Sequence, residues 1–348
     1  MHENLTSLFT DIADAIREKT GSTDAIVADQ FPEAIAGISA GGSTEEEWIG
    51  DGNTHIWVSL QEGRTNPRVG IYVKGTITVD WGDGSEQDVI QNTTYTNQRL
   101  YYSPVHEYEK PGDYVITLSG DGEFGVYGTA NYCSYLLAAP SESGYPANYS
   151  YANAIRRVEL GGAVTGIGEY AFQNCYSLTS VFIPEHITSI GNYAFQYCYS
   201  LDSVQIPDSV TTFGGYAFSR CYSLNSIRIP ERVTHIADYA FKYCPALKSL
   251  NIHGGVNSIG KEAFSYCYGL ASVNISGGVN SIGQMAFSSC GGVRYYDFLQ
   301  HTYVPTLSAT NVFSNATTDC QIRVPASLVN EWKAATNWST YADRIVGV

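Results

Sequence analysis

Six cysteines of the sequence recur at one constant interval of twenty-three positions: Cys175, Cys198, Cys221, Cys244, Cys267 and Cys290. Cysteine side chains can form disulfides, bind metal ions or act as nucleophiles, so their spacing indicates which chemistry is open to them. Zinc sites use clustered C-x-x-C or Cys/His spacing, and cysteines this far apart in the sequence do not supply such a cluster. We therefore predict no metal site at these cysteines.

Each cysteine belongs to the same phrase, for example IGNYAFQYCYSLDSVQIPDSVTT at 190–212. A fixed period of this length is typical of a solenoid, in which one short unit stacks on copies of itself. Stacking would place each apolar residue beneath its counterpart in the next unit, with short strands about 4.8 Å apart. In the second unit these apolar residues are Ile190, Ala194, Phe195, Cys198, Leu201, Val204, Ile206 and Val210.

The stack also leads to a prediction about the oxidation state of the cysteines. Neighbouring Cα atoms would lie within disulfide range. Parallel side chains in a stack, however, point in the same direction instead of toward each other. Cysteine outside disulfides is among the most buried residue types. We predict reduced, structural cysteines whose role is packing.

Catalytic motifs are missing from the sequence. It contains no G-x-S-x-G, no H-E-x-x-H, no phosphate-cradling glycine loop and no C-x-x-C pair. The histidines are scattered, and the acidic run at 45–47 lies in a linker. We predict a protein that is not an enzyme and uses no cofactor.

The composition narrows the range of partners. The 348 residues have a formal net charge of −15 and a pI near 4.8. Nucleic-acid binding needs a basic surface, so we expect no nucleic-acid partner and no attachment to an anionic membrane. No apolar run approaches the roughly 18 residues of a membrane span. Residues 1–21 lack the features of a secretory signal. We expect no signal peptide, no transmembrane segment and no membrane insertion.

Residues 1–40 are predicted to form a helical anchor, followed by the flexible linker SAGGSTEEE. A second short helix is predicted at 31–38. Two short helices bury little surface alone, so they need a partner such as another subunit or a larger assembly. The first helix is indicated by apolar residues at i, i+3, i+4 and i+7 spacing, namely Leu5, Leu8, Phe9, Ile12 and Ile16.

Residues 41–127 alternate in the manner of β-strands and contain the motifs WGDGS at 81–85 and HEYEKPGDYVITL at 106–118. These motifs resemble those of PKD-like domains. The resemblance implies an immunoglobulin-type β-sandwich that serves as a spacer or adhesion module. Asp80, Asp83 and Asp88 could form a calcium site, although turn formation explains them better.

The remaining residues divide into three segments. Residues 128–160, with the out-of-period Cys133, are predicted to be an irregular N-terminal cap. Residues 161–325 resemble BspA-like leucine-rich repeats through their A-F-x-x-C-x-x-L-x-x-I-x-I-P core, and Phe313 belongs to a stretched last repeat. Residues 326–348 are predicted to be a helical C-terminal cap in which Trp332 and Trp338 cover the open end. The fold class is multidomain α+β: short helices, a PKD-like sandwich and a leucine-rich-repeat solenoid.

Candidate binding residues are those that vary while the repeat frame stays constant. In the phrase L-x-S-V-x-I, period two sends Leu, Val and Ile inward and the two x positions outward. The outward candidates are Thr179, Phe182, Asp202, Gln205, Asn225, Arg228, Lys248, Asn251 and Asn274, with Ala271 beside them. Tyrosines flank the cysteines and favour a ligand-contacting surface, with carbohydrate as one candidate ligand: Tyr176, Tyr197, Tyr199, Tyr222, Tyr243, Tyr266 and Tyr268. A further series is interpreted as structural: Tyr170, Tyr193, Tyr216 and Tyr239.

These features together predict a non-enzymatic binding or adhesion protein. The words LTSLFTDIADAIREKTG and ADQFPEAIAGI resemble segments of tail-associated proteins of phages and prophages. This resemblance implies a tail fibre or receptor-binding protein located in the virion, whose N-terminus docks to tail components. Its array would recognise a host-surface protein or glycan, and a homo-oligomer such as a trimer would suit that role. The alternative is a BspA-type bacterial surface adhesin, extracellular or on the cell surface, that binds host proteins or cells.

Overall fold

The computed structural model describes residues 51–61, 65–67, 72–92, 105–121, 123–126 and 153–348. The chain divides into two compact units, Met1–Asp51 and Gly52–Val348. The helices predicted at 5–16 and 31–38 lie outside the described residues, as does Cys133. All further description concerns the unit Gly52–Val348.

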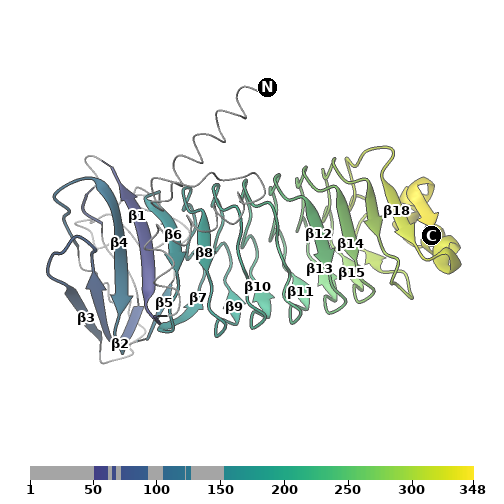
Figure 1. Cartoon of the computed structure of the whole chain (residues 1–348). Coiled ribbons are helices and arrows are strands. Elements are labelled where there is room, and N and C mark those ends of the chain that lie inside the picture. Colours follow the sequence, from purple (N-terminus) through teal and green to yellow (C-terminus); the bar gives the residue numbers. More distant parts are fainter. Residues whose placement is uncertain (1–50, 62–64, 68–71, 93–104, 122, 127–152) are drawn as a thin grey trace, which may run out of the picture. The chain divides into compact units, whose positions relative to one another are not determined.

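Two ladders of short parallel strands build the solenoid, and they form two rows in Figure 1. The sequence repeats one segment of each ladder per turn, so equivalent strands of neighbouring turns pair in parallel along most of the array. The first ladder contains β6 (Ile155–Glu159), β8 (Ser180–Phe182), β12 (Ser249–Ile252), β14 (Ser272–Ile275), β16 (Tyr295–Asp297), β18 (Gln321–Val324) and β19 (Ile345–Gly347). The second contains β7 (Val164–Ile167), β9 (Ser189–Ile190), β10 (Thr212–Phe213), β11 (His235–Ile236), β13 (Ser258–Ile259), β15 (Ser281–Ile282) and β17 (Thr306–Leu307).

Both ladders are interrupted near the middle of the array. In the first, a single bridge joins Phe182 to Gln205, and regular pairing resumes at β12. In the second, the pairing of β9 with β10 ends before β11. Phe213 occupies a position that is isoleucine in the neighbouring units, and its ring packs edge-on against Phe218 and Phe241 at 6.0 and 5.9 Å. The larger side chain therefore lies where the second ladder opens.

The strands before the array are continuous with it. They are β1 (Thr54–Leu60), β2 (Tyr72–Asp80), β3 (Asp88–Asn92), β4 (Gly112–Ser119) and β5 (Glu123–Val126), and they pair antiparallel with one another. β1 pairs with β6, and β5 pairs with β7. One ten-stranded sheet thus runs from one ladder through β5, β2, β4 and β1 into the other. At this end both ladders have a paired neighbour instead of an open edge.

The irregular cap predicted at 128–160 is described only in its last eight residues, 153–160. Residues 128–152 lie outside the described residues, but Ile155–Glu159 form the regular strand β6, with apolar side chains buried and paired on both sides. The predicted sandwich at 41–127 is observed only as the strands β1 to β5.

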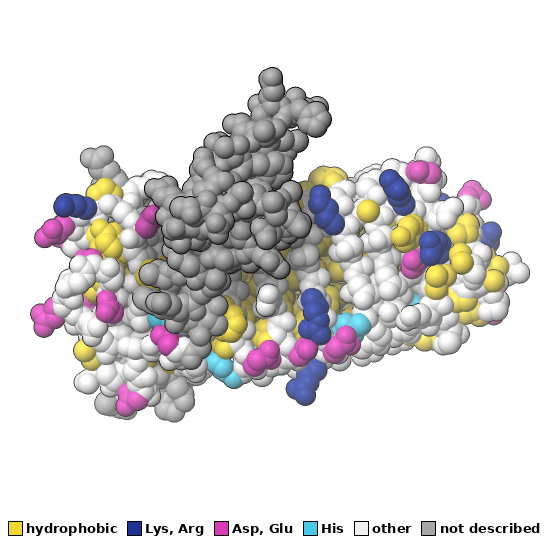
Figure 2. Space-filling view, viewed as in Figure 1, with side chains coloured by type: hydrophobic (Ala, Val, Ile, Leu, Met, Phe, Trp, Pro, Cys, Tyr) yellow, Lys and Arg dark blue, Asp and Glu magenta, His cyan; other side chains and the backbone are white. Residues whose placement is uncertain are grey.

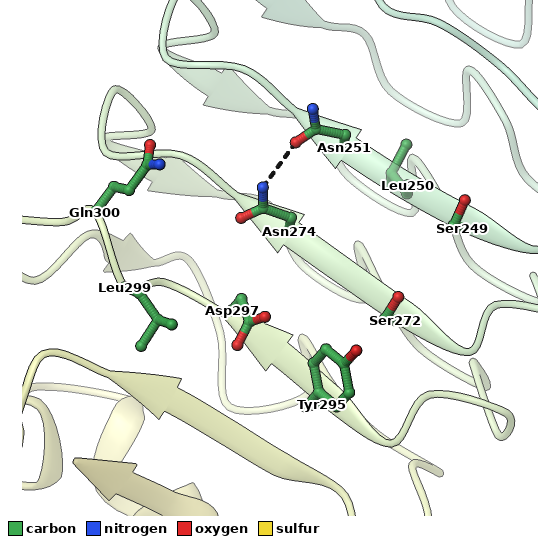
Figure 3. Close-up of a pocket in the computed structure, with 9 residues that line it drawn as sticks. All are labelled: Ser249, Leu250, Asn251, Ser272, Asn274, Tyr295, Asp297, Leu299 and Gln300. Atoms are coloured by element: carbon green, nitrogen blue, oxygen red, sulfur yellow. Dashed lines mark hydrogen bonds between the residues drawn. The ribbon is translucent and has the colours of Figure 1, made fainter. Parts of the chain in front are cut away.

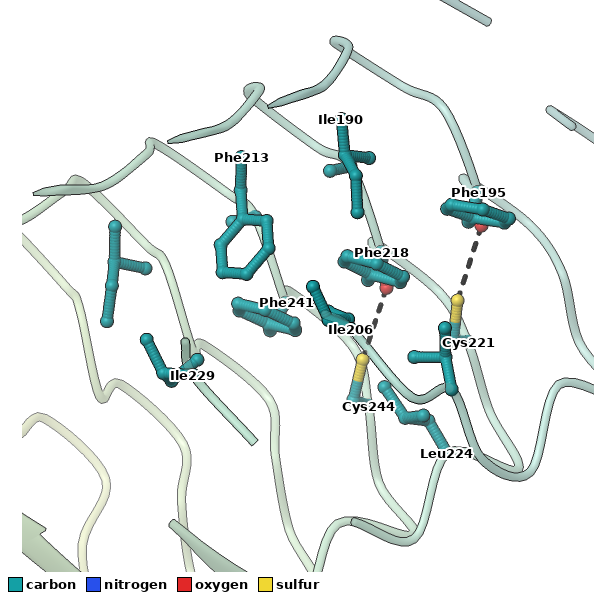
Figure 4. Close-up of a cluster of buried hydrophobic side chains, with 14 of the residues drawn as sticks. Ile190, Phe195, Ile206, Phe213, Phe218, Cys221, Leu224, Ile229, Phe241 and Cys244 are labelled. Carbon is teal, nitrogen blue, oxygen red and sulfur yellow. Dashed lines mark hydrogen bonds between the residues drawn. The ribbon is translucent and has the colours of Figure 1, made fainter. Parts of the chain in front are cut away.

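The interior of the solenoid consists of columns of identical side chains. Phenylalanine rings stack along the axis with centroids 5.0–5.5 Å apart from Phe172 to Phe287, and Phe313 follows at 5.8 Å. Five thiols of the series, those of Cys198, Cys221, Cys244, Cys267 and Cys290, donate to a phenylalanine carbonyl of the preceding turn, as Cys221 Sγ does to Phe195 O at 3.2 Å (Figure 4). The six cysteines of the series are buried and point the same way, as predicted. Burial raises the pKa values of Cys267 and Cys290 well above the ordinary value.

A third wall of the solenoid is made of turns around Ala-Phe, and it contains tyrosines in an unusual backbone conformation. Tyr170, Tyr193, Tyr216 and Tyr239 all have φ between 57° and 61°. Left-handed backbone is uncommon for residues other than glycine. Here the amide of Tyr193 donates to Gly215 O of the next turn, and its ring stacks on Tyr170 and Tyr216 at 4.9 Å. Stacking and inter-turn hydrogen bonds stabilise this conformation, which agrees with the structural role predicted for the series.

The C-terminal residues cover the end of the solenoid, as predicted. The helix α3 (Val329–Ala334) and the 3-10 helices η2 (Ala326–Leu328) and η3 (Trp338–Arg344) precede β19. Trp332 and Trp338 are fully buried and contact each other at 4.6 Å and Phe298 at 5.0 and 5.5 Å. A solenoid with a small C-terminal helix is therefore confirmed.

Candidate functional site

The strand face is the outward side of the first ladder, and it carries the first group of candidate residues. All nine predicted residues from Thr179 to Asn274 are exposed, and Phe182 has 47% of its surface exposed. A large apolar side chain with this exposure is available for contact with another molecule. The role of these nine residues in binding stays a prediction. For Phe182, Gln205, Arg228, Asn251 and Asn274, the outward direction follows from the alternation of S-V-x-I.

Serines share this face and were missed by the sequence interpretation. Strict alternation covers only S-V-x-I, so the serine and the second variable residue point outward while Val and Ile point inward, as the burial of β12 shows. The first variable residue, Lys248 in this unit, lies before the strand. The missed serines are Ser180, Ser203, Ser226, Ser249 and Ser272. Applying the two-residue period from the buried Ile backward would have found them.

A tyrosine ridge borders the beginning of these strands. It consists of Tyr176, Tyr199, Tyr222 and Tyr268. The first three rings stack at 4.9 and 4.7 Å, and Tyr222 and Tyr268 have 38% and 52% of their surface exposed. Pro245 replaces the tyrosine between them. The ridge thus offers aromatic surface beside the strand face.

The tyrosines that precede the cysteines are less available. Tyr197, Tyr243 and Tyr266 are half-buried, and Tyr243 stacks on Tyr266 at 4.4 Å. Arg220 takes the equivalent position between Tyr197 and Tyr243, with its guanidinium carbon 5.3 and 4.6 Å from their ring centres. A guanidinium over aromatic faces is a favourable cation–π contact. This column is therefore occupied mainly by internal packing.

A groove lies on the strand face at β12, β14 and β16 (Figure 3), with a volume of about 490 Å³. The register aligns two rows across these strands. One row is Ser249, Ser272 and Tyr295, and the other is Asn251, Asn274 and Asp297. Leu299 and Gln300 complete one end of the groove.

Hydrogen bonds and an ion pair fix the polar groups of this groove. Asn274 Nδ2 donates to Asn251 Oδ1 at 2.9 Å. Asp297 Oδ1 pairs with Arg323 Nε at 2.6 Å, and the guanidinium of Arg323 lies 4.4 Å from the ring centre of Tyr295. The sequence interpretation included Asn251 and Asn274 but missed Tyr295 and Asp297. Extending the repeat period by one more unit from Ser272 and Asn274 would have found both.

Charge is distributed unequally along the sequence. Residues 1–154 contain 7 of the 19 basic and 22 of the 34 acidic side chains, so 12 of each remain in residues 155–348. The array is thus formally neutral, and the net charge of −15 arises entirely before it. Figure 2 shows basic and acidic side chains intermixed on the visible face of the array. The acidity of the whole chain therefore says nothing about the ligand of the array.

The WGDGS and HEY motifs meet in one hydrogen-bonded cluster. Asp83 accepts from the Ser85 amide at 3.0 Å and pairs with His106 Nε2 at 2.7 Å. The Tyr108 hydroxyl donates to Trp81 O at 2.7 Å. Burial tends to raise the pKa of Asp83, but hydrogen bonds from Ser85 and His106 outweigh it and lower the pKa to about 2.

The other two acidic residues of this region also have protein partners. Asp80 accepts from the Gly82 amide and from Gln87, and Asp88 accepts from Trp81 Nε1. This agrees with their interpretation as turn residues. Within the described residues, no group of three His, Cys, Asp or Glu side chains could hold a metal ion, and no helix is long and apolar enough to cross a membrane.

The fold and its exposed strand face define a leucine-rich-repeat solenoid. Residues 149–327 match the model of the BspA type leucine rich repeat region in six copies, and the chain belongs to this family. The sequence matches none of the curated proteins.

Several solved structures resemble parts of the chain, including the three that follow. The leucine rich repeat protein of T. pallidum is 28% identical, with 41% of this chain and 70% of that chain covered and a TM-score of 0.39. The pneumococcal vaccine antigen PcpA is 15% identical, with 53% and 42% covered and a TM-score of 0.40. A leucine rich cell surface protein of Faecalibacterium prausnitzii is 23% identical, with 52% and 75% covered and a TM-score of 0.24.

Proposed function

We propose that the chain is a non-enzymatic binding protein whose repeat array attaches to a macromolecule on a cell surface. The observation that carries this proposal is the contrast between the two sides of the first ladder. The inward side repeats apolar residues in every turn, whereas the outward side carries, around a constant serine, residues that vary along the array, and it adjoins exposed tyrosines. A constant frame with variable exposed residues is the arrangement by which solenoids present extended binding surfaces.

The experiment compares whole-cell binding by the full chain with binding by two triple variants. The first changes Phe182, Gln205 and Arg228 to Ala on the strand face, and we expect it to lose binding at least ten-fold. Its matched control changes three exposed threonines within or directly before strands of the second ladder to Ala: Thr188, Thr212 and Thr234. Both variants should keep the unfolding temperature of the parent. Equal binding by the parent and the strand-face variant would exclude this part of the face as a contact surface.

The finer proposal is a receptor-binding protein of a phage or prophage tail. The resemblance of residues 1–40 to tail-associated segments supports it. In this role those residues attach to the particle, and the array meets a protein or glycan on the host. Deleting residues 1–40 should then abolish incorporation into particles while leaving cell binding by the purified chain intact. A deletion variant that is still incorporated into particles would exclude the anchor role.

A second candidate is a bacterial surface adhesin, and the match to the BspA type family favours it. An adhesin acts from the surface of the cell that makes it. Antibodies to the array should then label intact producing cells in the absence of any phage particle. Labelling confined to released particles would favour the tail protein instead.

A further inference from the structure

We propose that the groove across β12, β14 and β16 binds a neutral pyranose sugar of a cell-surface glycan. This inference rests on the proposed binding function and names the ligand of one part of the strand face. The volume of about 490 Å³ lies within the range of small-molecule sites, which is roughly 300–1,000 Å³. The lining includes the hydroxyl groups of two serines, the amide groups of two asparagines and the aromatic ring of Tyr295.

Tyr295 offers an aromatic surface to a ligand in the groove. Arg323 reaches over its ring from β18, at 4.4 Å from the ring centre. The aligned neighbour on β14 is Ser272, whose side chain is too short to cover the ring (Figure 3). A pyranose has a face of C–H groups that packs against an aromatic ring, as other apolar surfaces do. In the row Ser249, Ser272 and Tyr295, the last residue is therefore the one that offers a ring on which a sugar can stack.

The two asparagines offer a donor and an acceptor at fixed positions. Because Asn274 Nδ2 donates to Asn251 Oδ1, the amide orientations are set. The bond uses Asn274 Nδ2 and Asn251 Oδ1. The other atoms of the two amides, Asn251 Nδ2 and Asn274 Oδ1, have no hydrogen-bond partner among the described residues. One donor and one acceptor side by side match two neighbouring hydroxyls of a sugar, each of which both donates and accepts. Ser249 and Ser272 add hydroxyl groups of the same kind.

The charge of the groove favours a neutral sugar over an acidic one. Asp297 is the acidic side chain of the lining, and the ion pair with Arg323 already matches it. Lys248 and Arg294 are exposed at positions before the strands and are not part of the lining. An anionic sugar would place its charge near Asp297 without an unpaired cation to receive it. Selectivity for neutral sugars follows.

The test uses the purified full chain and the methyl glycosides of glucose, mannose, galactose and N-acetylglucosamine, with glucuronic and sialic acid as acidic probes. Saturation-transfer NMR should show contact with at least one neutral glycoside at a roughly millimolar Kd, since an open groove covers one side of the ligand only. Tyr295→Ala should weaken binding at least ten-fold. Ser272→Tyr, which fills the groove with a residue favoured in strands, should do the same.

Two control variants match these changes outside the groove. Tyr303→Ala removes a tyrosine of 37% exposure, and Asn257→Ala removes an exposed asparagine near the second ladder. Both should bind sugar as the parent does, and circular dichroism should show all four variants folded. The absence of transfer to every neutral glycoside, equal transfer to the groove variants, or preference for the acidic sugars would each overturn the proposal.

The outcomes separate this proposal from the proposed function. Cell binding that persists while no sugar binds would overturn the sugar site and indicate a protein receptor, with the binding function intact. Sugar binding that is lost in Tyr295→Ala, in a chain that attaches to no cell, would support the groove and count against the cell-surface role.

Discussion

Backbone hydrogen bonds close the N-terminal end of the solenoid, whereas side chains close most of the C-terminal end. At the first end, β1 and β5 pair with β6 and β7, so strands from outside the repeat continue both ladders. At the other end, only β19 extends a ladder. The last strand of the second ladder, β17, instead meets side-chain donors: Asn337 Nδ2 bonds to Leu307 O and Trp338 Nε1 to Pro305 O, each at 2.7 Å.

This difference shows how a repeat fold can end. Internal turns form most of their backbone hydrogen bonds with neighbouring turns, whereas the first and last turns have groups without a partner from the repeat. A flanking sheet supplies many partners at once but requires strands of matching direction. A short C-terminal segment can supply only a few, placed individually, together with a large apolar cover.

The largest expected loss of stability comes from removing part of the apolar cover at the C-terminal end. Trp338→Ala removes a fully buried side chain that contacts Trp332, Phe298 and Phe313, together with its hydrogen bond to Pro305 O. Burial of this size indicates a loss of about 3–5 kcal/mol in the free energy of unfolding. Urea unfolding followed by far-ultraviolet circular dichroism measures it. Hydrogen exchange should rise first in β16 to β19, and a rise that begins at β6 and β7 would contradict side-chain closure of this end.

A matched change at the N-terminal end should lower the free energy of unfolding by less than Trp338→Ala does. Ile56→Ala removes a fully buried side chain from β1, at the position aligned with Ile116 of β4 and Val158 of β6. The expected loss is about 2–5 kcal/mol, with the backbone hydrogen bonds of β1 retained. Exchange should rise in β1, β4 and β6 while β18 and β19 stay protected. Loss of protection throughout the array would show that the two ends unfold together.

The next largest effect is expected from a decrease in pH, which should destabilise the C-terminal end before the N-terminal end. Burial beside Phe298 and Trp332 lowers the pKa of His301 below its ordinary value of 6.5. The unfolded chain therefore takes up this proton first, and the stability that neutral His301 provides is complete above about pH 6.5 and falls as the pH decreases below it. Asp83 near the other end has a pKa lowered from 3.8 to about 2, so its contribution is lost only as the pH falls from about 4 toward 2.

We therefore expect exchange protection of the C-terminal turns to weaken between pH 7.5 and 5 while the cluster around Asp83 stays protected. His301→Gln removes the titrating group and should flatten the pH dependence at the C-terminal end. The opposite order, with β2 to β4 opening first, would contradict this assignment.

Sequence periodicity was sufficient to predict the interior of this molecule. Phe195, Cys198 and Leu201 recur in successive units because each occupies the same buried position against its equivalents, so burial could be read from the period alone. The outward direction of Gln205 and Asn251 follows from the same period. The C-terminal aromatic cover was predicted because Trp332 and Trp338 are large apolar residues placed directly after the last repeat.

Features that depend on non-repeating partners could not be predicted in this way. The pairing of β1 with β6 joins strands far apart in the sequence, and neither strand contains a signal for the other. β19 has only three residues, too few for an alternation pattern. The groove was half predicted, because Asn251 and Asn274 lie in regular units, whereas Tyr295 lies where the phrase changes from Y-S-L to G-G-V and the repeat is harder to recognise.

The smallest expected effects come from single hydrogen bonds, and they sharpen the comparison of the ends. Tyr341 accepts from the Phe313 amide at 3.1 Å and donates to Thr310 O at 2.6 Å, whereas Thr54 Oγ1 accepts from the Gly161 amide at 2.8 Å. Removing a partner from a buried polar group costs about 1–3 kcal/mol. Tyr341→Phe leaves two backbone groups without their partner and Thr54→Val leaves one.

Urea unfolding should therefore show the larger loss for Tyr341→Phe, with both losses below that of Trp338→Ala. Gly161 also lies so close to Asn53 that a Cβ there would be 2.3 Å from its carbonyl oxygen, so the backbones at this end remain packed when the hydroxyl is lost. The two backbone groups that Tyr341 bonds have no equivalent reserve, since both of these hydrogen bonds come from this one side chain. A larger loss for Thr54→Val would show that one side-chain bond, and not the strand pairing around it, closes the N-terminal end.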